Sequence, residues 1–177
     1  MQREAANTRK SIRRSITVFA AAVLGVGALG LAACGSDDDD KPKEQGTPAV
    51  AATWEAAWKD NDPQRLAALF TADGARYTDH AFHRTSTGRD GVAKWAGTTK
   101  QFIQGAVLKV DDAFGGSDKV AINWTFSGQL AGAPKPFSVP AVAILTLRGN
   151  EIATDDDYYD LADVLRQSGL PADTNFG

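Results

Sequence analysis

The spacing of apolar residues changes once along the chain, and this change limits the folds open to it. Between residues 50 and 103, apolar side chains recur mainly every three or four positions, which is the period of a helix. Between residues 107 and 159, stretches of alternating apolar and polar side chains have the period of a strand. Helices followed by consecutive strands predict an α+β fold with an antiparallel sheet.

Two of the expected helices begin with a capping residue followed by proline. These pairs are Thr47-Pro48 and Asp62-Pro63. The first residue of each can cap the helix with its side-chain oxygen, and the proline fits the first turn because it has no backbone N–H that would need an acceptor. A third helix is expected to begin near Asp90. Between the second and third helices we expect a short strand over residues 75–78 and an irregular loop over residues 79–88.

The strand-forming half divides at turn sequences such as Gly115-Gly116-Ser117-Asp118. Strands are expected over residues 107–114, 119–129, 137–148 and 151–159, with a short helix over residues 161–167. Pro140 predicts a sheet edge or a bulge, because proline has no amide to donate. In the second of these strands Trp124 and Asn123 belong to opposite faces, and the sequence leaves open which face lines a cavity.

Composition excludes several classes of protein. The chain has 177 residues, a length typical of about one domain, and a formal net charge of −3. Nucleic-acid-binding proteins usually carry a basic excess, so we expect no nucleic-acid partner. The single cysteine, Cys34, excludes disulfides within the chain and a cysteine-rich zinc site.

The first 33 residues have the pattern of an export signal. They hold five of the basic residues and one acidic residue, so the remainder carries −7. An uncharged apolar stretch follows the basic start and ends in small residues. Leu31-Ala32-Ala33-Cys34 resembles the lipobox of bacterial lipoproteins, L-[AS]-[GA]-C. This resemblance implies that the Cys34 thiol is acylated and that the chain is cut just before it.

A single membrane-spanning helix of about 18 residues is the alternative interpretation of the same stretch. Both interpretations place the rest of the chain outside the cytoplasm at the cell membrane, and both leave open whether export is general or twin-arginine. Four consecutive aspartates from Asp37 then predict an extended linker. We therefore expect a signal peptide (1–33), a lipidated cysteine with an acidic linker (34–47), a folded domain (48–172) and a tail (173–177).

Three segments of the folded domain resemble the SnoaL-like branch of the nuclear transport factor 2-like superfamily. Residues 58–74 are similar to its "W..gD...l..ly.pD" opening, residues 87–92 to its "GrdaI" helix start, and residues 157–169 to its "WDYYDl...l.qlG" ending. The resemblance implies a cone: a curved antiparallel or mixed sheet wrapped around three N-terminal helices, with a short C-terminal helix. The family uses the cone's cavity for polyketide cyclisation, steroid isomerisation, epoxide hydrolysis or binding alone.

Asp157 occupies the position of the aspartate that acts as acid and base in SnoaL-like cyclases. A carboxyl group in an apolar cavity has a raised pKa and can move a proton between carbon and oxygen. Asp156 stands where the family usually has an aromatic residue. Strand alternation sends Asp155 and Asp157 to one face and Asp156 to the other. The two carboxyl groups then either share a proton or lie at a solvated strand end.

A second group of candidate residues consists of Tyr77, Asp79, His80 and His83. The resemblance implies that the strand of Tyr77 and Asp79 contributes to the cavity mouth. His80 or His83 is a candidate general acid near neutral pH. The spacing Asp79-His80-x-x-His83 matches no established metal pattern, so we predict no metal and no cofactor. The four tryptophans are expected to be core residues: Trp54, Trp58, Trp95 and Trp124.

Three hypotheses for function follow. The leading one is a membrane-anchored domain that binds a small apolar or aromatic molecule. The second is an acid/base enzyme of the cyclase or isomerase type that uses Asp157 with Asp79, His80 or Tyr77. The third is an interaction module that pairs two copies through the sheet. The sequence contains no G-x-S-x-G nucleophile motif and no phosphate-binding loop.

Overall fold

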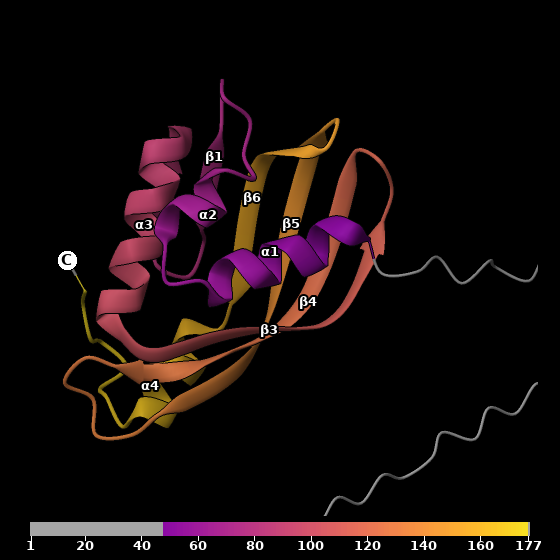
Figure 1. Cartoon of the computed structure of the whole chain (residues 1–177). Helices are drawn as coiled ribbons and strands as arrows, with labels where there is room; N and C mark the ends of the chain where they lie inside the picture. The colour runs from indigo at the N-terminus through magenta and orange to yellow at the C-terminus, as the bar shows by residue number, and fades with distance from the viewer. Residues whose placement is uncertain (1–47, 177) are drawn as a thin grey trace, which may run out of the picture. The chain divides into compact units, whose positions relative to one another are not determined.

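Three helices cover one face of a six-stranded sheet in the computed structural model, which describes residues 48–176 (Figure 1). The elements in chain order are α1 (Ala49–Lys59), α2 (Pro63–Ala67), β1 (Arg76–Asp79), β2 (Arg84–Thr87), α3 (Gly88–Phe102), β3 (Ile103–Gly115), β4 (Lys119–Leu130), β5 (Phe137–Arg148), β6 (Glu151–Tyr159) and α4 (Leu161–Ser168). The expected signal peptide, Cys34 and the acidic linker lie outside the described residues. Within those residues no helix has the length and apolar character needed to cross a bilayer.

The helix boundaries follow local capping chemistry. The Asp62 side chain accepts a hydrogen bond from the Gln64 amide at 3.0 Å, which satisfies a free amide at the start of α2. Pro48 is the N-cap of α1 and not its first residue, so this helix begins one position later than the sequence predicts. At the other end of the domain, α4 closes with Gly169 in a left-handed conformation, at a φ of 73°.

The sheet has the strand order β2-β1-β6-β5-β4-β3. Four of its pairings are antiparallel, whereas β1 and β6 run parallel, so the sheet is mixed. The parallel register sets Tyr77 beside Asp155 and Asp79 beside Asp157. Residues about 80 positions apart in sequence therefore meet at the centre of the sheet.

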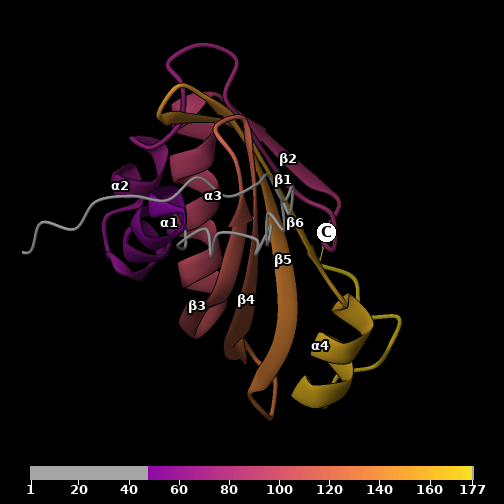
Figure 2. The same cartoon turned by 90° about the vertical axis from the view of Figure 1, so that its right-hand side faces the viewer.

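The sheet curves around the helices, and β3 is the strand that bends most visibly (Figures 1 and 2). Its pairing with β4 is shifted between Gln104 and Val107 and again between Val110 and Asp112. Gly128 of β4 faces the first of these irregularities. A Cβ at Gly128 would lie 2.5 Å from Cγ2 of Ile103, so only glycine allows the two strands to approach this closely. The fold confirms the expected α+β cone.

Two local expectations were wrong. Residues 79–88 do not form an irregular loop, because residues 84–87 pair with β1 as strand β2. Three of its four residues are exposed, so no apolar alternation marked it as a strand.

Pro140 lies in the interior strand β5, and no bulge occurs beside it. The pairing of β5 with β6 begins only at Ala141, so Pro140 has no ladder partner on that side.

The inner face of the sheet is mostly apolar on β4 and β5. On β4, the residues of the Trp124 face are buried against the helices, whereas those of the Asn123 face are half-buried on the outer side. The question left open by the sequence is therefore answered: the aromatic face lines the interior of the cone.

Candidate functional site

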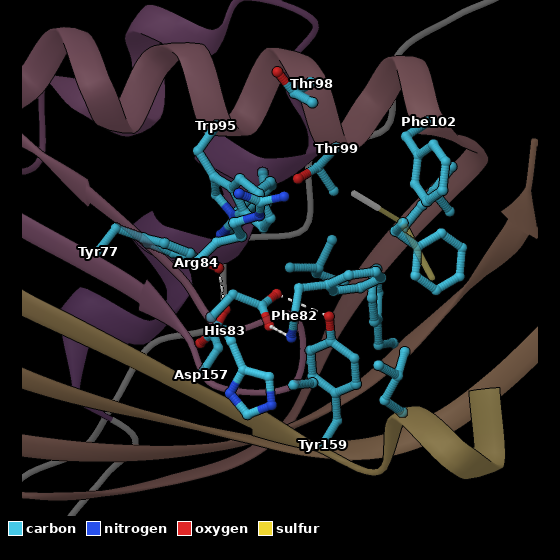
Figure 3. Close-up of a pocket in the computed structure, with 18 of the residues that line it drawn as sticks. Tyr77, Phe82, His83, Arg84, Trp95, Thr98, Thr99, Phe102, Asp157 and Tyr159 are labelled. Carbon is cyan, nitrogen blue, oxygen red and sulfur yellow. Dashed lines mark hydrogen bonds between the residues drawn. The ribbon is translucent and has the colours of Figure 1, made fainter. Parts of the chain in front are cut away.

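A cavity of about 380 Å³ lies between α3 and the inner face of the sheet (Figure 3). We call it the cone cavity. Trp95, Thr98, Thr99 and Phe102 contribute from α3, and Asp157 and Tyr159 from β6. The remaining lining residues come from α1, the β1–β2 hairpin, β3, β4, the start of α4 and the C-terminal end: Trp58, Tyr77, Asp79, Ala81, Phe82, His83, Arg84, Ile103, Leu108, Trp124, Phe126, Leu161, Thr174, Asn175 and Phe176.

Aromatic rings make up much of the cavity wall. Trp58 and Tyr77 meet edge to face with centroids 6.1 Å apart, and Trp95 lies 6.2 Å from Tyr77. Across the cavity, Tyr159 contacts Trp124 and Phe126 at 6.4 and 5.3 Å. Trp54, Trp58 and Trp124 are core residues as expected, and Trp95 is partly buried against the core. Trp58, Trp95 and Trp124 also line the cavity, a second role that the sequence analysis did not predict. Periodicity groups such rings on one face of a helix or strand, but it carries no information on whether that face lines a cavity or whether the space between the rings is filled.

Two tyrosine–aspartate pairs supply the polar groups at the base of the cavity. The Tyr77 hydroxyl donates a hydrogen bond to Oδ2 of Asp157, and the Tyr159 hydroxyl donates to Oδ2 of Asp79 at 2.8 Å (Figure 3). Both pairs connect β1 with β6, whose parallel register brings them together. Asp79 also accepts a hydrogen bond from the Phe82 amide at 2.8 Å, which orders the turn after β1.

Asp155 lies behind Asp157 and is fully buried. Its Oδ2 accepts a hydrogen bond from Nε1 of Trp54 at 2.8 Å. The Oδ1 atoms of Asp155 and Asp157 meet no donor group among the described residues. When Asp157 is protonated, its carboxyl group can donate a hydrogen bond to Asp155, and this bond occupies the remaining oxygen of each group. Of the two alternatives raised by the sequence, the solvated strand end is therefore wrong, and a buried pair is present.

Burial controls the proton affinities of this cluster. It raises the pKa of Asp155 to about 7. Burial, reinforced by the neighbouring charge of Asp155, raises the pKa of Asp157 well above its ordinary value. Burial also raises the pKa of Asp79, as well as those of the Tyr77 and Tyr159 hydroxyls. Burial therefore favours the protonated form of Asp157, and Asp155 is close to its midpoint near neutral pH.

The structure separates His80 from the other three candidates. Its Nε2 lies 3.0 Å from Oδ1 of Asp156, and its ring stacks on Tyr158 with centroids 4.2 Å apart. Asp156 and Tyr158 belong to the outer face of β6, so His80 does not line the cone cavity. His83 lines the mouth instead, on a turn where it adopts a φ of 53°. Side chains in a turn do not alternate regularly between two faces, so the sequence could not show which of the two histidines faces the cavity.

The C-terminal segment is part of the site, although the sequence analysis treated residues 173–177 as a tail. Thr174, Asn175 and Phe176 line the cavity mouth. The Phe176 ring lies 5.1 Å from that of Phe82 and 5.3 Å from that of Phe102. A phenylalanine near the end of the sequence was the one feature that could have indicated that this segment packs against the domain.

No cluster of three or more histidine, cysteine or acidic side chains in residues 48–176 has an arrangement suited to a metal ion. The expected absence of a metal and of a cofactor stays a prediction. The chemistry available to the cone cavity is that of aromatic surfaces, hydroxyl groups and carboxyl groups.

Comparison with known proteins identifies this arrangement. The family model of the SnoaL-like domain matches residues 50–154. A protein with a ketosteroid isomerase-like fold from Catenulispora acidiphila, solved in complex with trimethylamine, is 41% identical at a TM-score of 0.70. The match covers 73% of this chain and 98% of that one. No curated protein sequence matches the chain.

More distant structures share the fold alone. An NTF2-like protein from Burkholderia thailandensis is 18% identical at a TM-score of 0.60, covering 69% of this chain and 95% of its own. TsrD from Streptomyces laurentii is 24% identical at a TM-score of 0.57, covering 68% and 92%. The cone, its cavity and these matches define an NTF2-like fold. The chain belongs to the SnoaL-like domain family.

Proposed function

We propose that the cone cavity binds a small, mostly apolar or aromatic molecule. The observation that carries this proposal is the enclosure of about 380 Å³ by aromatic rings from α1, α3, β4 and β6. Ligand pockets commonly measure roughly 300–1,000 Å³, so the ligand is small. The Catenulispora relative was solved with trimethylamine, a molecule of three methyl groups on one nitrogen, which supports a ligand of modest size.

Binding without turnover is the simpler function because the oxygens of Asp157 are occupied or covered. Oδ2 accepts the Tyr77 hydroxyl, and Oδ1 is buried. A general base needs direct or water-mediated reach to the proton that it removes. Asp157 must therefore move or exchange partners before it can act on a ligand.

Calorimetric titration with p-cresol, a small neutral aromatic molecule, tests the binding proposal. Thr99→Phe adds a ring inside the cavity and is expected to abolish the binding seen with the wild type. Lys94→Phe adds the same ring at an exposed position of α3 that does not line the cavity, and should bind like the wild type. Equal binding by all three proteins, or binding by none, would contradict the proposal.

An acid/base enzyme of the cyclase or isomerase type is the second candidate function. The buried Tyr77–Asp157 pair favours it, because a raised pKa suits a carboxyl group that transfers protons near neutral pH. Tyr77, Asp157 and Asp79 would form the site, and His80 would have no part in it. Exchange of the α-protons of cyclohexanone in D₂O, followed by NMR, tests this function. Faster exchange with the wild type than with Asp157→Asn supports it, whereas equal rates argue against it.

We further propose that a lipid on Cys34 anchors the domain to the outer side of the cell membrane. The support is the lipobox-like sequence Leu31–Cys34 and the absence of any other cysteine from the sequence. Phase partitioning in Triton X-114 tests the proposal: the wild type should enter the detergent phase and Cys34→Ser should stay in the aqueous phase. Identical partitioning of the two would rule out the anchor.

Pairing of two copies through the sheet is also a proposal. The outer face of the sheet carries three exposed large apolar side chains, Val107 and Phe114 on β3 and Tyr158 on β6. Sedimentation velocity should detect a dimer that Phe114→Ser weakens. A monomer at high protein concentration would exclude pairing.

A further inference from the structure

Two buried carboxyl groups line the base of the cone cavity, a third lies next to them on β6, and none of the three has a basic partner among residues 48–176. Asp79, Asp155 and Asp157 are at most 4% exposed, and none of the ion pairs formed by residues 48–176 includes them. Their hydrogen-bond donors are tyrosine hydroxyls, an indole N–H, backbone amides and, within the pair, a carboxyl group. The cluster thus holds several potential negative charges and no fixed positive charge.

The other charged groups near the cavity leave this imbalance in place. Asp156 points to the opposite face, where Arg76 and His80 lie against it. His83 and Arg84 line the mouth and are exposed, so water screens their charge. A buried carboxylate without a counter-charge costs several kcal/mol, and it takes up a proton in compensation.

The cavity wall offers a favourable surface to a cation. The face of an aromatic ring carries negative electrostatic potential, and rings of tryptophan, tyrosine and phenylalanine attract organic ammonium ions. Trp58, Trp95 and Trp124 contribute such rings, together with Tyr77 and Tyr159. An organic cation suits these walls better than a metal ion, because few oxygen atoms in the cavity are free to coordinate one.

We propose that the ligand of the cone cavity is a small organic ammonium ion, held by the aromatic walls and neutralised by the buried carboxyl groups. This inference rests on the proposed function and names its ligand class. The charge of the ligand then takes the place of the protons held by the carboxyl groups. Because burial keeps the pKa of Asp157 high and that of Asp155 near 7, binding should release protons at neutral pH.

An isosteric pair of probes tests the charge directly. Choline and 3,3-dimethylbutan-1-ol have the same shape and differ in one atom. The central atom of the branched group is a positively charged nitrogen in choline and a neutral carbon in the alcohol. We expect the full chain at pH 8 to bind choline about tenfold or more tightly than the alcohol. At pH 5 this preference should shrink, because the carboxyl groups are protonated. Calorimetry in buffers of different ionisation enthalpy should also show proton release with choline and none with the alcohol.

Variants locate the effect. Asp157→Asn and Asp155→Asn keep the side-chain shape and remove a charge, so each should reduce the preference for choline at pH 8. Asp73→Asn changes an exposed carboxylate outside the cavity and should leave the preference unchanged.

The outcomes separate this inference from the proposed function. Equal affinity for choline and the alcohol, or binding of p-cresol without binding of choline, overturns the ammonium inference while the cavity stays a binding site. Binding of none of the three probes overturns both. A preference for choline that survives in both aspartate variants also overturns the inference, because the buried carboxyl groups would then play no part.

Discussion

Replacing Asp155 by asparagine should stabilise the protein, and the gain should depend on pH. Asparagine keeps the oxygen that accepts the Trp54 indole N–H, and its amide can donate to Asp157. The substitution removes a group that is fully buried and forms no ion pair with any residue of the described domain. The cost of ionising that group in the folded state is therefore absent from the variant.

The sign and size follow from the pKa of Asp155. Its ordinary value is 3.8, and burial raises it to about 7. Between these values the folded state binds more protons than the unfolded state, so the free energy of unfolding falls as the pH rises. Each pH unit corresponds to about 1.4 kcal/mol while only the folded state holds the proton, so the wild type should lose about 2 kcal/mol through this group between pH 5 and pH 7. The loss is complete about one pH unit above 7, where the curve levels.

Urea denaturation followed by tryptophan fluorescence, repeated from pH 5 to pH 8.5, measures this effect. Asp155→Asn should show a flatter profile and exceed the wild type by up to about 4 kcal/mol at pH 8.5. The exposed control Asp73→Asn should run parallel to the wild type. Parallel profiles for wild type and Asp155→Asn would refute the reasoning, because Asp155 would then ionise alike in the folded and unfolded states.

Three further changes have defined outcomes. Trp54→Phe removes the N–H donated to Asp155 and should lower the free energy of unfolding at pH 8.5 by about 2 kcal/mol, measured by urea denaturation. Gly128→Ala forces a Cβ to 2.5 Å from a methyl of Ile103 and should cost about 1–3 kcal/mol in the same assay. Deletion of residues 174–177 uncovers the cavity mouth, so p-cresol should enter faster in stopped-flow measurements.

Each of these changes has a matched comparison. Trp58→Phe alters a ring on the same helix whose Nε1 has no hydrogen-bond partner among residues 48–176, so its cost should not grow with pH. Gly116→Ala adds a Cβ where no atom lies within 4 Å and should be nearly neutral. For the deletion, entry at the wild-type rate would show that the C-terminal segment does not cover the mouth.

Some of the candidate site could be derived from the strand pattern alone. Alternation placed Asp155 and Asp157 on the face opposite Asp156, and the structure has them there. The resemblance selected Tyr77 and Asp79 on the adjacent strand, and both line the cavity. Sequence reasoning had no access to the parallel register of β1 and β6, which pairs residues 78 positions apart and so brings these four side chains together.

Other parts of the site depend on spatial relations that have no local signal. His80 and His83 are three residues apart in one turn, and the turn geometry alone sends His80 to the outer face and His83 to the mouth. Phe176 contacts rings of the β1–β2 turn and α3, which no pattern near the chain terminus indicates. The hairpin strand β2 was missed because its exposed residues lack apolar alternation.

The sequence by itself determined the order of the helices and the long strands, the capped start of α2 and the division of the alternating strands into an apolar and a polar face. These features depend on residues within a few positions of one another, because capping and periodicity are local effects. Only the tertiary structure decided that three tryptophans line a cavity and that three carboxyl groups lie buried with no cationic partner in the part of the chain that the structure describes. The volume of the cavity and the low dielectric around the carboxyl groups are produced by elements that are distant in sequence. Both therefore exist only when the sheet has folded around the helices.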